Sequence, residues 1–533
     1  MITGDSGLMI KAADSSEITG IANEKEYLSL SVVSAKLDDE NGILTKENLQ
    51  IHLDKTIGNN KAEVISNGNK FEVYFIESNR TYELDKTGVI EENYQKVEKD
   101  NYPGSIDIDI NGNILDGSLE LPYEINCIED LVVLSNMTRG DGIKINSDGT
   151  IEEVTTINSF SGKYIILTNT LNFSSSSSYK NSERTDFGDV NNDGIVEGLL
   201  KELTTGEGFI PIGNYGVNNT KFCGNFNGND NEIINIYINR ENTAYQGLFG
   251  FVEGNINKLS VSGIIKGKAQ CGGITGYLGN GKIANCKNYA NIFGTHDLGG
   301  IAGYMSGNNE ICDSYNSGNI TGTSGNDVGG IASCNYQGGK VQRCVNEGKI
   351  TGKGQHVGGI LGSNWSEIAS CINRGNVESS MSQTGGITGY QWNGTVRNSY
   401  NSGNVVNTGT GETGGIVGWS GGSYIINSFS VGNVSNKSGN IGAVTGKNTG
   451  TVTNCSYLKN DNININKLGI AGTSDNAYRA YCYSDNIEDF YVSDFISSKM
   501  GWSAFVSEEM VTQNRLQCWI ITSNFLPKLY WEK

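Results

Sequence analysis

The sequence predicts a mainly β protein built around a right-handed parallel β-helix, a solenoid in which each repeat forms one coil. Three observations lead to this fold class. One phrase of sequence recurs between residues 246 and 455, its anchors stand 26 to 30 residues apart, and short β-branched runs separated by Gly and Asn lie between them. A period of that size marks a solenoid. Runs of this kind favour strands and tight turns over the 3.6-residue pattern of helical repeats.

Three columns of equivalent positions define the predicted interior. The first holds only small residues, the second holds asparagine and then serine, and the third holds isoleucine. Stacked asparagine amides tolerate the turn conformation and can satisfy the backbone at successive corners. In order, the columns are Cys286, Ser314, Cys344, Cys371, Ser399, Ser428 and Cys455; Asn288, Asn316, Asn346, Asn373, Asn401 and Ser430; and Ile274, Ile301, Ile331, Ile360, Ile387 and Ile416.

The repeated phrases GGIxG, I-x-N-S/C-Y and N-x-G-N-I resemble the GLUG repeat of bacterial surface proteins. This resemblance covers about two-fifths of the chain. The preceding segment is similar to the usual lead-in to such repeats, at residues 162–168, 211–213 and 222–228. The resemblance implies surface display or adhesion and does not point to one ligand.

Composition narrows the classes of partner. The chain has 533 residues and a net charge of −19, which argues against binding to nucleic acid or anionic membranes because both need clustered Lys and Arg. Eleven cysteines leave at least one thiol unpaired in a monomer. Cys344 and Cys371 would lie on adjacent coils within disulfide range, but their side chains would point the same way. We therefore favour free buried thiols over a disulfide, and no Cys-x-x-Cys pair supports a zinc site.

Residues 1–92 predict a separate α+β domain. Apolar residues at helical spacing indicate a long amphipathic helix from Leu8 to about Leu37, and Thr45 is placed to cap a shorter helix that stops at Gly58. Three strands are expected at 62–66, 70–77 and 80–85. Residues 3–8 and 21–26 resemble the region after the hydrophobic segment of type IV pilin-like proteins, although the cleavage motif and the hydrophobic half-helix are absent. The resemblance implies a full-length form anchored in the membrane or assembled into a pilus; the alternative is an unrelated small α+β domain.

The remaining boundaries follow from changes in composition. Residues 93–120 are polar and predict a linker, 121–245 an N-terminal cap with the first coils, and 456–533 a C-terminal cap. A short helix is expected from Ile128 to Leu134, where it could cover the open end of the β-helix.

One acidic segment resembles the opening of a calcium loop. Asp189, Asn191 and Asp193 alternate as oxygen ligands, Gly194 suits the sharp turn and Glu197 adds a carboxylate. The twelfth position is Leu200, so a complete EF-hand is excluded. Calcium is the one cofactor that the sequence suggests, and the alternative is an acidic turn in a surface insertion.

No motif for catalysis fits its required context. The G-x-S-x-G match at residues 418–422 falls inside the repeat and lacks an α/β unit around it, and the three histidines form no zinc motif. Charged residues of the repeat are scattered without a repeated partner, as on a solvated face. They are Asp297, Glu310, Asp327, Lys340, Glu347 and Arg374. We therefore expect no enzyme activity, with a polysaccharide lyase or glycosidase as the alternative.

An aromatic column is the candidate binding surface. It lies three residues after the core isoleucine, on the opposite side of the strand, and comprises Phe251, Tyr277, Tyr304, Tyr390 and Trp419, interrupted by Cys334 and Ser363. Trp365 and Trp392 lie next to it. If the rings face outward they can stack on sugars or dock a protein. The alternative is that they pack under neighbouring loops.

These patterns together predict an extracellular adhesin of the cell surface. Its partners would be a glycan or surface protein and, through the pilin-like region, other pilin subunits. The alternatives are the carbohydrate-active enzyme and a structural minor pilin without its own ligand.

Overall fold

The structure is a computed structural model that divides into two units, residues 1–102 with 108–114 and residues 103–107 with 115–533. Each unit is described by itself. The described residues are 24, 27–36, 44–59, 61–67, 70–75, 80–85, 90–91, 105–107, 109, 114–146, 151–173, 206–215, 220–381, 383–459, 480–484, 486–491, 495–502, 518–522 and 525–532.

The first unit packs two helical segments against an antiparallel sheet. Residues 27–36 are helical, and the rest of the long helix expected from Leu8 lies outside the described residues. The side chain of Thr45 accepts a hydrogen bond from the Asn48 amide and caps α2, which ends before Gly58 as predicted. The elements are α2 (Lys46–Ile57), β1 (Ala62–Asn67), β2 (Lys70–Phe75), β3 (Arg80–Asp85) and β4 (Ile90–Glu91). The sheet runs in the order β1-β2-β3-β4.

One compact core holds the first unit together. Leu28, Val32, Leu49 and Leu53 from the helical segments bury against apolar residues of the sheet such as Val73. Among the described residues, no helix is both long enough and apolar enough to cross a membrane.

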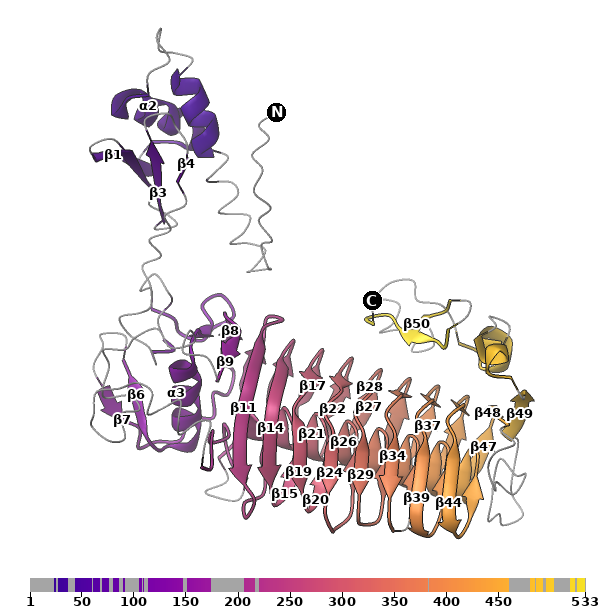
Figure 1. The fold of residues 1–533 in the computed structure, drawn as a ribbon. Helices are drawn as coiled ribbons and strands as arrows, with labels where there is room; N and C mark the ends of the chain where they lie inside the picture. The colour runs from indigo at the N-terminus through magenta and orange to yellow at the C-terminus, as the bar shows by residue number, and fades with distance from the viewer. Residues whose placement is uncertain are drawn as a thin grey trace. The chain divides into compact units, whose positions relative to one another are not determined.

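The second unit is a parallel β-helix, which confirms the predicted solenoid (Figure 1). Its strands stack in register from coil to coil and form several ladders. The eight-stranded ladder comprises β12 (Phe249–Val252), β16 (Thr275–Leu278), β21 (Ala302–Ser306), β26 (Ala332–Tyr336), β31 (Leu361–Asn364), β36 (Thr388–Trp392), β41 (Val417–Gly421) and β46 (Thr445–Asn448).

A seven-stranded ladder precedes these strands in each coil and carries the Gly-Gly anchors at its end. It comprises β15 (Ala269–Cys271), β20 (His296–Leu298), β25 (Val328–Gly329), β30 (Val357–Gly358), β35 (Thr384–Gly385), β40 (Thr413–Gly414) and β45 (Ile441–Gly442).

An eleven-stranded ladder contributes at least one buried apolar residue from each strand to the core. It comprises β5 (Tyr123–Ile125), β8 (Tyr164–Leu167), β10 (Asn225–Asn227), β13 (Asn255–Asn257), β17 (Lys282–Ala284), β22 (Glu310–Cys312), β27 (Lys340–Gln342), β32 (Glu367–Ala369), β37 (Thr395–Arg397), β42 (Tyr424–Ile426) and β47 (Thr451–Thr453).

The last ladder receives two short strands from most coils, and the first of each pair carries the asparagine column. Its strands are β9 (Leu171–Asn172), β11 (Glu232–Arg240), β14 (Ser260–Gly267), β18 (Lys287–Asn288), β19 (Asn291–Gly294), β23 (Tyr315–Asn316), β24 (Ile320–Gly322), β28 (Val345–Asn346), β29 (Ile350–Gly352), β33 (Ile372–Asn373), β34 (Val377–Ser379), β38 (Tyr400–Asn401), β39 (Val405–Thr410), β43 (Phe429–Ser430), β44 (Val434–Ser438), β48 (Cys455–Leu458) and β49 (Ala480–Ser484).

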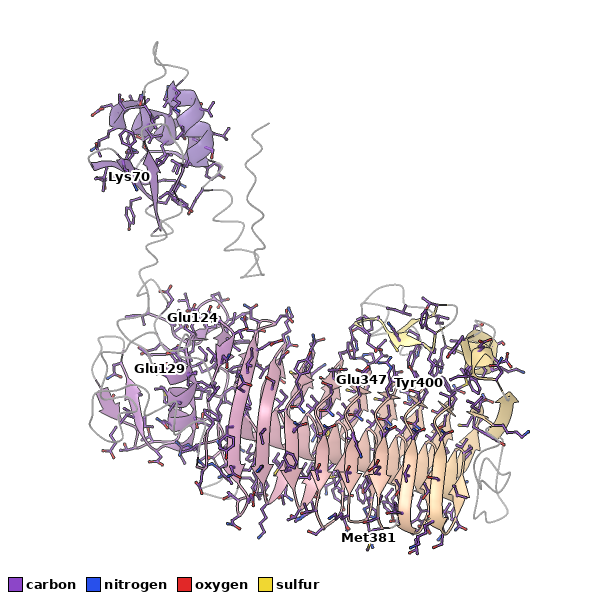
Figure 2. The ribbon with its side chains drawn as sticks, in the orientation of Figure 1. Lys70, Glu124, Glu129, Glu347, Met381 and Tyr400 are labelled. Atoms are coloured by element: carbon purple, nitrogen blue, oxygen red, sulfur yellow. The ribbon has the colours of Figure 1, made fainter. Side chains whose placement is uncertain are left out.

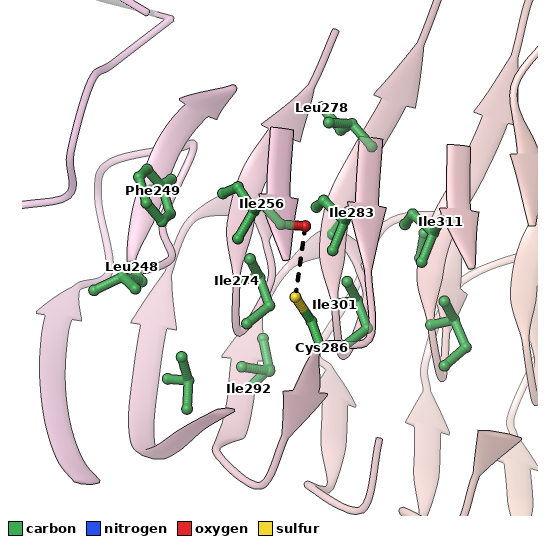
Figure 3. Packing of buried hydrophobic residues seen from close by; sticks show 14 of the residues in the cluster. Leu248, Phe249, Ile256, Ile274, Leu278, Ile283, Cys286, Ile292, Ile301 and Ile311 are labelled. Atoms are coloured by element: carbon green, nitrogen blue, oxygen red, sulfur yellow. Dashed lines mark hydrogen bonds between the residues drawn. The ribbon is translucent and has the colours of Figure 1, made fainter. Parts of the chain in front are cut away.

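The isoleucine and small-residue columns fill the interior, as the sequence predicts. Ile274 and Ile301 are fully buried in one continuous core with Ile256 and Ile283 of the neighbouring ladder (Figure 3). Cys286 lies among them, and its thiol contacts the Ile256 carbonyl oxygen at 3.8 Å. The thiols of Cys344 and Cys371 are free, as predicted. Burial, with the neighbouring Cys371, holds the pKa of Cys344 well above its ordinary value, so this thiol packs as a small apolar group.

The asparagine column forms the predicted ladder of side-chain amides. Nδ2 of Asn316 donates to Oδ1 of Asn346 at 2.7 Å, and Asn346 donates in the same way to Asn373 at 2.8 Å. Each Nδ2 also donates to the carbonyl oxygen two residues on, as from Asn373 to Gly375 at 2.8 Å. These side chains are fully buried. The ladder therefore satisfies polar backbone groups that no strand pairing reaches.

One end of the β-helix is covered by the residues that lead into it. Helix α3 (Ile128–Arg139) extends beyond the predicted 128–134 and packs against β5. Ile128, Leu131 and Leu134 belong to the solenoid core. The hairpin of β6 (Ile143–Ile145) and β7 (Ile151–Glu153) follows the helix.

The described C-terminal residues differ from a simple end cap. Strand β49 extends the ladder beyond β48, but the later residues turn back along the side of the solenoid. They form a helical turn (Ile487–Tyr491), a second turn (Phe495–Lys499) and the hairpin of β50 (Trp519–Ile520) and β51 (Lys528–Leu529). Trp502, Trp519 and Leu529 bury against outward side chains of four coils, Val345, Ile372, Tyr400 and Phe429. These coils carry apolar residues outside, and the C-terminal aromatic residues cover them.

Candidate functional site

The aromatic column lies on the outer side of the eight-stranded ladder. Tyr277 pairs in register with Tyr304, and Tyr390 pairs with Trp419. Leu278, the next residue after Tyr277, points into the core, so the alternation of the strand turns the Tyr277 ring outward. The column rings after Phe251 are half-buried, and Phe251 itself is buried.

The rings of the column contact one another in two clusters. In the first cluster, the Tyr277 and Tyr304 rings stack with centroids 5.5 Å apart, and Tyr215 stacks on the other side of Tyr277 at 4.8 Å. In the second, Tyr390 contacts Trp419 at 5.2 Å and Trp365 at 5.8 Å. Ring-on-ring packing accounts for the half-burial of these side chains.

Trp392 is the most open ring of the second cluster. Its side chain is 43% exposed, and its plane lies 10° from that of Tyr390. At the end of the column, the Lys447 ammonium lies 4.5 Å above the Trp419 ring. The structure thus brings Trp365, Tyr390, Trp392 and Trp419 together, whereas Tyr277 and Tyr304 belong to the other cluster.

Sequence reasoning missed three rings of these clusters. Tyr215 comes from a segment before the repeats and carries no periodic signal. Tyr245 packs 6.1 Å from Tyr277, and Tyr336 packs 5.1 Å from Trp365. A signal for Tyr336 did exist, because it stands two residues after the column position, as Trp365 and Trp392 do in the next coils.

A polar column runs along the seven-stranded ladder, within its first two strands and one residue before each of the next four. Its members stand two residues before each Gly-Gly anchor, and backbone pairing places them on successive coils. They are Gln270, Asp297, Asp327, His356, Gln383 and Glu412.

Hydrogen bonds link the members of this polar column. The Gln270 amide donates to Asp297, and Nδ1 of His356 lies 2.9 Å from Oδ1 of Asp327. Gln383 donates to Glu412 at 3.0 Å. The expectation that Asp297 and Asp327 belong to a solvated face without partners is wrong. Their side chains are only 14% and 18% exposed, because the neighbouring coils and rings cover them.

Glu310 and Glu347 stay accessible to solvent, as expected, but each has a charged partner on an adjacent coil. Glu310 pairs with Lys282 at 3.1 Å, and Glu347 pairs with Arg374 at 3.0 Å. In-register coils bring such side chains together although they stand about 30 residues apart in the sequence.

Asp297 and Asp327 form a carboxylate pair in the gap of the aromatic column. Cys334 and Ser363 leave this gap between the Tyr304 and Tyr390 rings. Burial raises the pKa of Asp297 to about 7, and the negative charge of Asp327 adds to the rise. The Ser363 hydroxyl donates to Asp327, and His356 stacks on Tyr390 with centroids 4.7 Å apart. The Asp297 carboxyl therefore changes between its neutral and ionised forms close to neutral pH.

Ser363, His356 and Asp327 do not have the geometry of a catalytic triad. Ser363 contacts Nδ1 of His356 at 3.1 Å, and Asp327 contacts the same nitrogen. A triad needs the serine and the carboxylate on opposite ring nitrogens.

Two of three comparisons with known proteins found no match. No model of a protein family matches it. No curated protein matches it either. Among solved structures, it is similar to a crystal structure described as "a putative immunoglobulin A1 protease from Bacteroides ovatus", with 16% identity and a TM-score of 0.38 over 79% of this chain and 96% of that one. A likeness at this level carries no argument about activity, so function has to be argued from the site.

The predicted calcium loop lies in a part of the chain that the structure does not describe. Asp189, Asn191, Asp193 and Glu197 all lie outside the described residues. Among the residues that are described, no group of three or more His, Cys, Asp or Glu side chains could hold a metal ion.

Replacement of Asp297 by Asn should stabilise the protein in a pH-dependent way. The pKa of Asp297 is raised from 3.8 to about 7, so its neutral form favours the folded state fully below about pH 4. That contribution is lost as pH rises through 7. One pKa unit corresponds to about 1.4 kcal/mol, so the full shift sets an upper bound of about 4 kcal/mol. Solvent screening and the hydrogen bond from Gln270 reduce this value, and we expect Asp297→Asn to raise the free energy of unfolding by ~2 kcal/mol at pH 8 and to leave it unchanged at pH 4.

Urea unfolding at the two pH values measures this difference. Asp230→Asn is the control, since it removes the same charge from an exposed side chain that lies 3.5 Å from Lys258. An equal effect of Asp297→Asn at pH 4 and pH 8 would contradict the raised pKa.

Proposed function

We propose that this chain is an attachment protein of the cell surface that binds a glycan along the aromatic column. The observation that carries the proposal is the two clusters of outward tyrosine and tryptophan rings, with the open Trp392 ring beside them. Aromatic rings offer a flat apolar surface with little conformational entropy to lose, which suits the apolar faces of sugar rings.

The polar column supports a sugar over a wholly apolar ligand. Gln270 and Glu412 of this column are partly accessible to solvent, and their amide and carboxylate groups can pair with sugar hydroxyls. A protein ligand that presents polar and aromatic side chains is the second partner consistent with this surface.

Display at the cell surface rests on the resemblances in the sequence. The GLUG-like repeats imply surface display, and the pilin-like N-terminal region implies anchoring or assembly with other pilin subunits. A β-helix suits display because each coil adds roughly 4.8 Å of length while pairing its own strand edges.

A glycan array with the whole chain tests the proposal. We expect binding to at least one glycan, and at least a tenfold loss in the triple variant Tyr304→Ala, Tyr390→Ala and Trp419→Ala. Their side chains point outward, so the solenoid core of the variant stays intact. Tyr424→Ala is the matched control, because this tyrosine is 51% exposed on the different ladder that contains β42.

Each outcome of the array has a defined meaning. Equal binding by the wild type and the triple variant, with melting temperatures within a few degrees, would rule out the aromatic column. Binding by neither protein to any glycan would favour a protein ligand or a structural minor pilin.

A second candidate function, cleavage of the bound glycan, is favoured by the Asp297–Asp327 pair. Equivalent side chains on adjacent coils stand about 5 Å apart, close to the spacing of two carboxyl groups in a retaining glycosidase. A carboxyl that is neutral near pH 7 suits a general acid. Release of reducing sugar that disappears in Asp297→Asn would support the enzyme, whereas binding without release supports attachment.

A further inference from the structure

A cavity lies between the side of the solenoid and the C-terminal residues, away from the aromatic column. Its volume is about 660 Å³. Glu347 and Tyr400 mark the solenoid wall of this cavity, which lies beneath the C-terminal hairpin (Figure 2). A cavity of this size accommodates one or two sugar rings or a molecule of similar bulk.

Hydrogen bonds hold the two walls together. The Tyr400 hydroxyl donates to the Pro527 carbonyl oxygen at 2.7 Å, and Nε1 of Trp531 donates to the Arg343 carbonyl oxygen at 3.1 Å. Nη1 of Arg374 bridges Glu347 of the solenoid at 3.0 Å and Glu532 of the C-terminal residues at 2.5 Å. The cavity is therefore a built feature of the fold with a fixed polar floor.

Aromatic side chains line both walls. Tyr289 and Tyr315 lie on neighbouring coils with ring centroids 5.9 Å apart, and Tyr289 is 40% exposed. Phe525 lies on the opposite wall and is 65% exposed. Much of the apolar surface of Phe525 is therefore exposed to solvent, and a flat ligand between the two walls would bury it.

The charge of the cavity is positive, in contrast to the chain as a whole. Arg374 is compensated by Glu347 and Glu532. Lys287 and Lys528 also line the cavity and are exposed, and within the described part of the chain neither ammonium group forms an ion pair. On a chain with a net charge of −19, two uncompensated cations next to open rings make a local site for an anion.

We propose that this cavity binds an acidic saccharide, a sugar whose ring lies against Tyr289 and Phe525 and whose carboxylate pairs with Lys287 and Lys528. The rings supply stacking, and the two ammonium groups supply the preference for a carboxylate over a neutral sugar. This site is independent of the aromatic column, and its failure would leave the proposed function untouched.

Isothermal titration calorimetry of the whole chain tests the proposal with two acidic probes, 3′-sialyllactose and trigalacturonic acid. Lactose is the neutral match, because it lacks only the acidic sugar of sialyllactose. We expect at least one acidic probe to bind at least tenfold more tightly than lactose, and 0.5 M salt to weaken that binding. Equal affinity for acidic and neutral probes, or no heat with any of them, would overturn the proposal.

Matched variants assign the binding to this cavity. The double variant Lys287→Ala with Lys528→Ala should lose at least tenfold in affinity at an unchanged melting temperature, since both side chains are exposed. Lys340→Ala removes an exposed lysine from another ladder and should bind like the wild type. The triple variant of the aromatic column should also keep this binding. Full binding by the lysine double variant would place the acidic sugar elsewhere and refute the assignment.

Discussion

Replacement of Asn373 by Ala should lower the free energy of unfolding by about 4 kcal/mol. The side chain accepts from Asn346 at 2.8 Å and donates to Asn401 at 2.7 Å and to the Gly375 carbonyl oxygen at 2.8 Å. Alanine leaves three buried groups without this partner: the donor Nδ2 of Asn346 and the acceptors Oδ1 of Asn401 and the Gly375 carbonyl oxygen. Each unsatisfied group costs roughly 1–3 kcal/mol. Urea unfolding followed by circular dichroism measures the effect.

The same coil offers a matched control. Asn376 is exposed, and its Oδ1 accepts from the Asn404 amide at 3.0 Å. Water can replace this bond, so Asn376→Ala should cost less than about 1 kcal/mol. If the two variants lost equal stability, the buried amide ladder would contribute no more than any surface asparagine, and the prediction would be wrong.

The interior of the solenoid was predictable because its physical demands repeat in every coil. Each coil must place a small residue, an amide and an isoleucine at equivalent positions. The residue types of one repeat therefore predict the buried positions of the next repeat. The sequence shows these demands directly, as Cys344 above Cys371 and Asn346 above Asn373 illustrate. The same regularity predicted the aromatic column but left open whether its rings face outward or pack under neighbouring loops. The strand pairing places Tyr277 and Trp419 on the outer side.

The outer features were harder to predict because their chemistry does not repeat. The polar column changes from Gln270 to Asp297 and then to His356, so it keeps its position but not its residue type. The cavity beneath the C-terminal hairpin depends on the ion pair between Arg374 and Glu532, which stand 158 residues apart in the sequence. Glu532 belongs to a C-terminal region without a sequence period. Contacts of this kind depend on where a non-repeating segment turns back, which no local pattern specifies.

Replacement of Gly386 by Ala should disrupt the stacking of the coils and cost at least ~3 kcal/mol. A Cβ atom at this position would lie 2.1 Å from the Gly415 carbonyl oxygen and 2.4 Å from Cγ of Asn401. The Gly415 carbonyl is part of the backbone of the next coil, and Asn401 is a member of the buried amide ladder across the same coil, so neither can move alone. Overpacking of a rigid interior typically costs 1–3 kcal/mol, and a displaced backbone adds to that cost.

Gly279→Ala separates this effect from the general loss of a glycine. Its Cβ would first meet Cγ of Glu253 at 2.9 Å and then the Phe251 ring at 3.2 Å, and a glutamate side chain can move aside. We expect Gly279→Ala to change the free energy of unfolding by less than about 1 kcal/mol. Equal stability of the two variants in urea would mean that the coils can separate enough to admit a methyl group. In that case the Gly-Gly anchors would be required for the turns of the backbone and not for the close approach of one coil to the next.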